Sequence, residues 1–322
     1  MSADEHSTGH IIQSLLVNVA IAVVKAIAAY FTHSGAMMAE ALHSLSDCGN
    51  QILLLIGVRQ AKKPADAEHP LGYGRAIYFW SFLVAVMLFA GGGLVSIWEG
   101  VQKIMHPEEL HHVLAGLIVL VVSIFLEGSA CLSNVRELNK RRKSVPFFRF
   151  LSATKDSDLV VVFAENSAAV LGLFFAIFAM LLAWKTGDGR WDGGGSVVIG
   201  LVLVGVAVFL AKEVMSLLLG ESADPELEAD VRRMTEAFPA FERVLNVVTV
   251  QQGPGEVLVS LKVACSPSLM IDEVCHTINA FEEKLRALRP EIRWVYVEPD
   301  IPFSRRGGAP SEAVTKRGDA AL

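Results

Sequence analysis

The sequence is poor in cysteine and in charged residues. Only four cysteines occur in 322 residues, and no two of them form a Cys-x-x-Cys pair. This spacing argues against a disulfide framework and against a structural zinc ribbon. Charged residues make up 19% of the chain and hydrophobic residues 52%, with a mean hydropathy of +0.45. Such a composition is too apolar for an ordinary soluble domain of this length.

Several functional signatures are also missing. The chain has no His-Glu-x-x-His motif and no serine or cysteine nucleophile beside a histidine, which argues against an intramembrane protease or another membrane metalloenzyme. The net charge of −6 gives no reason to expect a nucleic-acid partner. The start, "MSADEHSTGH", lacks the basic region of a secretory signal, so we expect the first apolar segment to be retained.

Long apolar segments dominate what is present. A run of about 18 or more apolar residues is typical of a transmembrane helix. We find six such segments, near residues 11–31, 36–58, 77–100, 112–132, 158–184 and 193–219. The sequence therefore predicts an all-α, six-span transmembrane bundle over residues 11–220, preceded by a short tail at 1–10.

The distribution of lysine and arginine predicts the orientation of these spans. The loops after spans two and four contain most of the basic residues, namely Arg59, Lys62, Lys63, Arg75, Arg136, Lys140, Arg141, Arg142, Lys143, Arg149 and Lys155. The loops at the opposite side contain only Lys103, Lys185 and Arg190. By the positive-inside rule, the basic loops and both termini are expected to be cytoplasmic. In a bacterium, this multi-pass protein would lie in the inner or plasma membrane.

The pattern changes after about Gly220. The segment "ADPELEADVRRMTEAF" has a helical period, and two β-rich runs, "VLNVVTVQQ" and "EVLVSLKVAC", flank the turn at 253–255. An amphipathic helix, "SLMIDEVCHTINAFEEKLRAL", and a strand, "EIRWVYVEP", follow. The order αββαβ predicts a small α+β, ferredoxin-like cytoplasmic domain over 221–302. Residues 303–322 show no pattern, and we expect a disordered tail.

Polar residues are concentrated in the second apolar segment. His43 and Asp47 are four residues apart and share one helix face with Glu40. We interpret Glu40 as an acid at the entrance to the site or as an accessory acid behind its ligands. An imidazole nitrogen and a carboxylate oxygen at this spacing suit Zn²⁺ or a similar divalent ion. Two side chains do not complete a tetrahedral site, so another span must supply further ligands.

The fifth segment offers the missing ligands. Glu165 and Asn166 interrupt an otherwise apolar run, at a depth that matches Asp47 to within a few Å at about 1.5 Å per helical residue. Asp156 and Asp158 lie nearer the start of the span, where we interpret them as helix N-caps or an entrance to the site. Glu127 and Asn18 are isolated polar residues, and the run of three glycines at 91–93 predicts close helix packing or a hinge.

These motifs together resemble the cation diffusion facilitator family of divalent-metal/proton antiporters. The likeness covers residues 10–300 and rests on "AEALHSLSD" with its His43-x-x-x-Asp47 pair, on "HPLGYGR" in the following loop, and on "DGGGSVVIGLVL" and "LLLGESADPEL" in and after the sixth segment. The resemblance implies a homodimeric exporter with a tetrahedral metal site between spans two and five, whose transport is driven by inward proton flow.

The fifth segment departs from the residue pattern that is usual in the family. Val162 and Asn166 stand where relatives commonly have His or Asp followed by Asp. A Glu-Asp pair at 165–166 resembles the branch that includes mitochondrial zinc exporters, and here the Asp has become Asn. We therefore take Glu165 as the acidic ligand from this segment and Asn166 as a carbonyl donor that cannot titrate.

Two accessory sites of the family are reduced. The loop after span two keeps Asp66 and His69, but Tyr73 stands where some relatives have a second histidine. In the C-terminal domain, Ser260 and Tyr296 replace histidines of zinc-binding relatives, whereas Cys275, His276 and Glu298 remain. We therefore expect this domain to serve packing and dimerisation.

The expected function is export of Zn²⁺, or a similar divalent cation, from the cytoplasm in exchange for protons. Because the fifth segment supplies only oxygen ligands, Fe²⁺, Co²⁺ and Mn²⁺ stay open as cargo. A membrane protein that binds metal without transporting it is the alternative from another class. We expect no resident cofactor, and as partners only a second copy of the chain and the lipid bilayer.

Overall fold

The computed structural model describes residues 3–142, 145–153 and 157–301. These form two compact units, Met1–Asp224 with Val250–Val257, and Pro225–Thr249 with Leu258–Leu322. Residues 303–322, for which the sequence predicts a tail, lie outside the described ranges. The first unit contains the long helices and the second contains most of the smaller α+β region.

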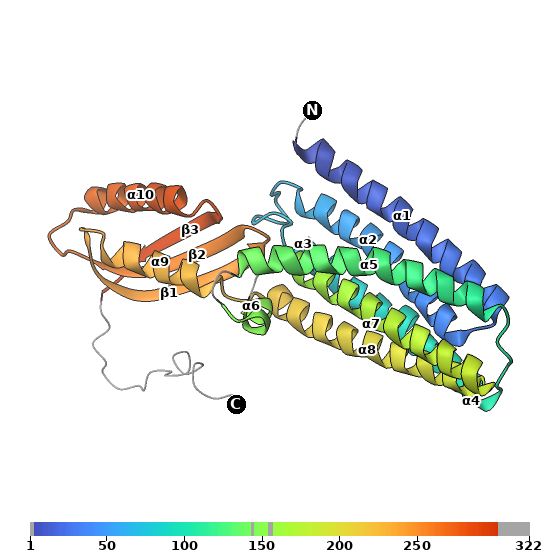
Figure 1. Cartoon of the computed structure of the whole chain (residues 1–322). Coiled ribbons are helices and arrows are strands. Elements are labelled where there is room, and N and C mark those ends of the chain that lie inside the picture. Colours follow the sequence, from blue (N-terminus) through green and yellow to red (C-terminus); the bar gives the residue numbers. More distant parts are fainter. Residues whose placement is uncertain (1–2, 143–144, 154–156, 302–322) are drawn as a thin grey trace. The chain divides into compact units, whose positions relative to one another are not determined.

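Every apolar segment found in the sequence is helical (Figure 1). The helices are α1 (Ala3–Thr32), α2 (Gly35–Ala61), α3 (Ala76–Met87), α4 (Val95–Met105), α5 (Val113–Arg141), α7 (Ser157–Thr186) and α8 (Arg190–Leu219), and a π-helical turn, η1 (Leu88–Leu94), joins α3 to α4. A short helix that the sequence did not predict, α6 (Phe147–Ala153), precedes α7. The first helix begins at Ala3, well before the expected residue 11.

Four of these helical stretches, within the described residues, are long and apolar enough to cross a membrane. They are Ala76–Met105, Val113–Arg141, Val160–Thr186 and Arg190–Leu219. Within the part of α1 whose side chains the structure describes, Asn18–Thr32 is an apolar stretch shorter than these four. The polar residues of α2 keep its hydropathy low, although it is as long as the others. The chain is thus a mostly helical, multi-pass membrane protein.

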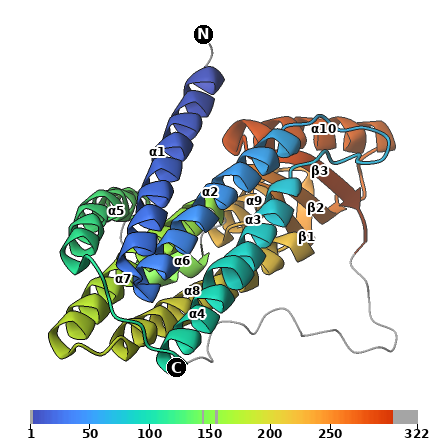
Figure 2. The ribbon, with the colours of Figure 1, turned by 90° about the vertical axis from the view of Figure 1, so that its right-hand side faces the viewer.

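The long helices form two groups that pack against each other (Figures 1 and 2). In the first group α1 contacts α2 and α5, and α7 contacts α2 and α5. In the second group α3, η1 and α4 all lie along α8, which also packs on α7. The core between them is aliphatic, with Leu120, Leu173, Ile199 and Leu203 fully buried.

Glycines bring the second group together, as the glycine run predicted. A Cβ added at Gly93 in η1 would lie 2.7 Å from Val204 of α8. Farther along, a Cβ at Gly100 of α4 would lie 2.6 Å from the carbonyl oxygen of Gly193. The backbones of α4 and α8 therefore approach closely only because these positions have no side chain.

The C-terminal part has the predicted order of elements. Helix α9 (Pro225–Glu236) precedes strands β1 (Phe241–Gly253) and β2 (Glu256–Cys265), and α10 (Ile271–Leu288) precedes β3 (Ile292–Pro299). The sheet has the order β1-β2-β3, and alternate residues of β2 are buried along one face. Phe281 of α10 is fully buried and makes edge contacts with Phe238 and Phe241, with ring centroids 5.2 Å apart in each pair.

Candidate metal site between α2 and α7

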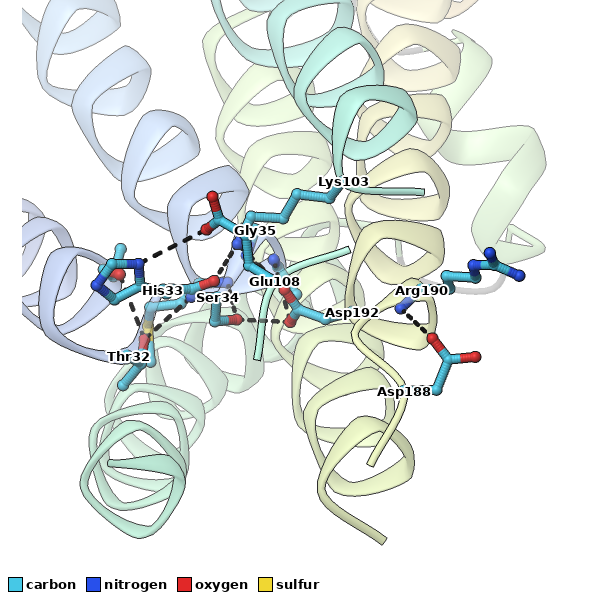
Figure 3. A network of polar contacts seen from close by, with 12 residues as sticks. Thr32, His33, Ser34, Gly35, Lys103, Glu108, Asp188, Arg190 and Asp192 are labelled. Carbon is cyan, nitrogen blue, oxygen red and sulfur yellow. Dashed lines mark hydrogen bonds and ion pairs between the residues drawn. The ribbon is translucent and has the colours of Figure 1, made fainter. Parts of the chain in front are cut away.

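The start of α2 is fixed by a buried carboxylate from another helix (Figure 3). Asp192 of α8 accepts hydrogen bonds from the Ser34 hydroxyl, at 2.6 Å, and from the backbone N–H of Gly35, at 2.5 Å. Ser34 in turn accepts a hydrogen bond from the backbone N–H of Met37, at 3.1 Å, as the N-cap of α2. Lys103 of α4 lies 3.7 Å from the same carboxylate. The polar face of α2 is therefore held in register against α8.

His43 and Asp47 lie together in the interior of the helical bundle. Their Nδ1 and Oδ1 atoms are 3.6 Å apart, as the i,i+4 spacing predicted. The His43 side chain is 1% exposed and that of Asp47 is 22% exposed. Among the described residues, neither nitrogen of His43 nor Oδ1 of Asp47 has a hydrogen-bond partner. Buried polar atoms without partners are costly, and here they are the electron-pair donors that a divalent cation binds.

On the facing helix, Glu165 of α7 is tied to α2 by an amide. Its Oε1 accepts a hydrogen bond from Asn50 Nδ2, at 2.7 Å. Asn50 Oδ1 has no hydrogen-bond partner within the described part of the chain. Asn50 is not among the residues predicted for the site, although its position three residues after Asp47 places it on the same face of α2.

In this structure, the predicted ligands do not converge on a single metal position. Within the described ranges, no three His, Cys, Asp or Glu side chains converge closely enough to hold a metal ion. His43 and Asp47 form one half of the predicted site, and Glu165 with Asn50 forms a second group. The four-ligand set of His43, Asp47, Glu165 and Asn166 therefore stays a prediction.

A cavity of about 720 Å³ adjoins these residues. Its walls come from α1, α2, α5 and α7, and the polar residues among them are Asn18, Ser44, Asp47, Gln51, Glu127, Ser133, Asn134 and Asn166. On each helix the lining runs from the level of Ser44 toward the end where the chain of α2 leaves the bundle at Ala61. Asp47 and Asn166 thus line the same polar cavity.

A buried ion pair, which the sequence reasoning missed, lies next to this cavity. Lys25 of α1 donates hydrogen bonds to Glu40 Oε2 at 3.1 Å, to Ser44 Oγ at 2.9 Å and to Glu127 Oε1 at 2.7 Å. Lys25 and Glu40 are both fully buried. The sequence feature that could have indicated this cluster is Lys25, a single lysine in the apolar segment at 11–31. Charged residues within membrane segments are usually functional. Glu40 is therefore an interior partner of Lys25 and not a residue at an entrance, which the sequence left as one option.

Comparison with known proteins identifies the family. Residues 11–219 match the cation efflux transmembrane domain. This chain belongs to the cation efflux, or cation diffusion facilitator, family. The match covers all of the long helices except the first turns of α1, so the predicted resemblance is confirmed.

Named relatives in the cation efflux family come from animals, plants and bacteria. The human mitochondrial proton-coupled zinc antiporter SLC30A9 is 33% identical over 235 residues, which are 72% of this chain and 41% of the relative. The cation-efflux pump FieF of Klebsiella pneumoniae is 26% identical over 235 residues, 73% of either chain. Metal tolerance protein C4 of Arabidopsis thaliana is 27% identical over 254 residues, 78% of this chain and 56% of the relative. The chain spans less than half the length of the mitochondrial antiporters that it matches.

In the loop after α2 of this cation efflux protein, the predicted accessory residues bind one another. Asp66 accepts hydrogen bonds from the backbone N–H of His69, at 2.7 Å, and from the Tyr73 hydroxyl, at 2.7 Å, and the His69 and Tyr73 rings stack at 4.1 Å. The Tyr73 hydroxyl lowers the pKa of Asp66, and the same bond raises the pKa of Tyr73. Tyr73 therefore uses the carboxylate that a metal would need.

The remaining predicted site residues give no further cluster. The side chain of Asp158 lies outside the described residues, as does all of Asp156. In the C-terminal unit Cys275 is exposed, and Glu298 pairs with Lys262 at 3.1 Å. Hydrogen bonds from Lys262 to Asp300 and Glu298 raise the pKa of that lysine.

Proposed function

We propose that this chain is a secondary transporter that exports Zn²⁺, or a similar divalent cation, from the cytoplasm in exchange for protons. The observation that supports it best is the pair His43 and Asp47, buried in a membrane bundle with free electron pairs beside a polar cavity. The names of the relatives, a proton-coupled zinc antiporter and a cation-efflux pump, favour the same activity.

The proposed transport site uses residues from two helices. His43 supplies a neutral nitrogen ligand, Asp47 and Glu165 supply two negative charges that balance a divalent ion, and Asn166 supplies a carbonyl oxygen. Binding of metal requires these ligands to be deprotonated, so metal and protons compete for them. If the site faces alternate sides of the membrane, this competition couples export of metal to entry of protons.

The membrane arrangement is part of the proposal. We propose six spans, with α1 and α2 added to the four more apolar ones, because their polar residues face the bundle interior and not lipid. The basic loops then place both termini and a ferredoxin-like C-terminal domain in the cytoplasm. We propose that the cavity admits metal from that side. We also propose a homodimer, which the resemblance to the cation diffusion facilitator family implies.

Zinc is the preferred cargo because a histidine nitrogen is among the ligands. The helix α7 side offers only oxygen, from Glu165 and Asn166, and Asn50 adds an amide oxygen. Oxygen ligands suit Mn²⁺ as well, so Mn²⁺, Fe²⁺ and Co²⁺ form the second candidate group of cargo. Competition between Zn²⁺ and Mn²⁺ for uptake ranks them directly.

The test is transport in proteoliposomes with a zinc indicator and a pH-sensitive dye. Wild type should take up Zn²⁺ and release protons together, and His43→Ala should abolish both signals. His106→Ala is the matched control, because His106 is exposed beyond the end of α4 and should leave transport unchanged. Undiminished flux in His43→Ala would refute the site assignment. Metal binding without flux in wild type would favour a non-transporting metal-binding protein.

A further inference from the structure

The ammonium group of Lys25 is buried and donates hydrogen bonds to three side-chain oxygen atoms. Its three hydrogens match three acceptors, one each from Glu40, Ser44 and Glu127, at 2.7 to 3.1 Å. A lysine has three donors and no acceptor, so the group is satisfied in full. The ligating oxygens come from α2 and α5, while the lysine comes from α1.

The carboxylates around Lys25 keep unused electron pairs. Glu40 Oε1 and Glu127 Oε2 are buried and have no hydrogen-bond partner among the described residues. Two carboxylates and one hydroxyl around a single positive centre are the oxygen ligands that hard divalent cations take. The centre carries one positive charge against two negative ones, so the group retains an excess of negative charge.

The backbone of α7 leaves room for this arrangement. A Cβ added at Gly172 would overlap Glu40 Oε1. Glu40 is thus held between the ammonium group of α1 and the bare backbone of α7. On the other side, Ser44 and Glu127 line the polar cavity, so ions in the cavity have access to the group.

We propose that Lys25 is a built-in cation, which fills a second cation site made by Glu40, Ser44 and Glu127 and so restricts the bundle to the metal site of His43 and Asp47. A buried carboxylate needs a positive partner, and Lys25 supplies it without an exchangeable ion. Without the ammonium group, a divalent ion takes its place among the same oxygens. This inference rests on the proposed function for the role of the His43 site, but not for the existence of the Lys25 site.

The experiment measures how many Mn²⁺ ions each chain binds, because Mn²⁺ suits an all-oxygen site. Purified protein in detergent is compared by equilibrium dialysis in a His43→Ala background, with and without Lys25→Met. Met has a similar length but no charge. We expect one additional Mn²⁺ per chain with Lys25→Met, and none with Lys25→Arg, which keeps the positive charge. Adding Glu127→Gln to Lys25→Met should remove the additional ion.

Several outcomes would overturn the proposal. One is an equal number of bound Mn²⁺ ions in folded protein with and without Lys25→Met. Another is an additional Mn²⁺ ion in Lys25→Met that remains when both Glu40→Gln and Glu127→Gln are added. If Lys25→Met does not fold, Mn²⁺ should restore folding, and the neutral variant Lys25→Met/Glu40→Gln/Glu127→Gln should fold without it. Failure of either rescue contradicts the inference. Flux by His43→Ala refutes the proposed transport site alone and leaves the Mn²⁺ difference intact.

Discussion

Replacing Asp192 by alanine should destabilise the bundle strongly, because this carboxylate caps a helix to which it does not belong. Its oxygens accept from the Ser34 hydroxyl at 2.6 Å and the Gly35 N–H at 2.5 Å, and Lys103 lies 3.7 Å away (Figure 3). The Asp192 side chain is 2% exposed. Water therefore cannot replace these bonds without opening the contact between α2 and α8.

The size of the effect follows from these contacts. A hydrogen bond to a charged group contributes about 1.5–3 kcal/mol, and removing one partner of a buried ion pair costs about 3–5 kcal/mol. Ser34 still caps α2 through Met37, which moderates the loss. We expect Asp192→Ala to lower the free energy of unfolding by about 3–4 kcal/mol. For a unit of this size, that is a decrease in Tm of about 6–16 °C.

The assay is thermal unfolding in detergent, followed by tryptophan fluorescence. Asp188→Ala is the matched control, because Asp188 is in the preceding turn and accepts a hydrogen bond from the Arg190 N–H at 3.0 Å in an exposed position. It should cost less than about 1 kcal/mol. Asp192→Asn should fall between the two, since an amide keeps one acceptor but no charge. Equal Tm values for Asp192→Ala and Asp188→Ala would refute the reasoning.

Three further predictions concern packing and the accessory loop. Gly193→Ala should lower the free energy of unfolding by about 1–3 kcal/mol, because its Cβ would lie 2.9 Å from the Gly100 carbonyl oxygen. Gly205→Ala in the same helix is the control and should be neutral or stabilising, since no atom of a neighbouring element lies within 4 Å among the described residues. Equal Tm values for the two variants would contradict this prediction. Phe281→Ala should destabilise the C-terminal unit by about 3–5 kcal/mol, measured by hydrogen exchange of β2; unchanged exchange would contradict it. Tyr73→Phe should raise the pKa of Asp66 in a carboxyl NMR titration, because it removes the hydroxyl bond. Ionised Asp66 stabilises the loop above its unfolded pKa of 3.8, and this stabilisation is lost as the pH falls through the lower pKa of the folded state. An unchanged titration midpoint of Asp66 in Tyr73→Phe would contradict this reasoning.

Local patterns predicted most of the fold. The helical positions followed from apolar runs, and the β1–β2 hairpin followed from Gly253-Pro254-Gly255, where Gly255 has a φ of 67°. The early start of α1 was missed because its first residues are polar, and α6 was missed because seven residues are too few to show a helical period. The length of the apolar segment at 36–58 predicts a span, whereas the polar residues of α2 leave its hydropathy below that of the four more apolar stretches.

The candidate site was predicted in part. His43 and Asp47 were found because both lie on one helix, where spacing alone determines that they meet. Partners from other helices depend on rotation and depth, which a single sequence does not specify. Glu165 was placed opposite Asp47 by depth, but its hydrogen bond to Asn50 and the pairing of Lys25 with Glu40 and Glu127 required the structure.

Lys25 and Asp192 show how the polar content of α2 is compatible with a membrane. Each is a buried charged residue on another helix, and each binds a polar group of α2, Glu40 in one case and the first backbone N–H groups in the other. Among the described residues, buried atoms of His43 and Asp47, and also Oε1 of Glu40, keep free electron pairs, and Asp47 lines the cavity. A membrane helix whose polar groups bind residues of neighbouring helices does not have to expose those groups to lipid. The low hydropathy of α2 is therefore compatible with a place inside a membrane bundle, because Glu40 and the first backbone N–H groups bind charged residues of other helices.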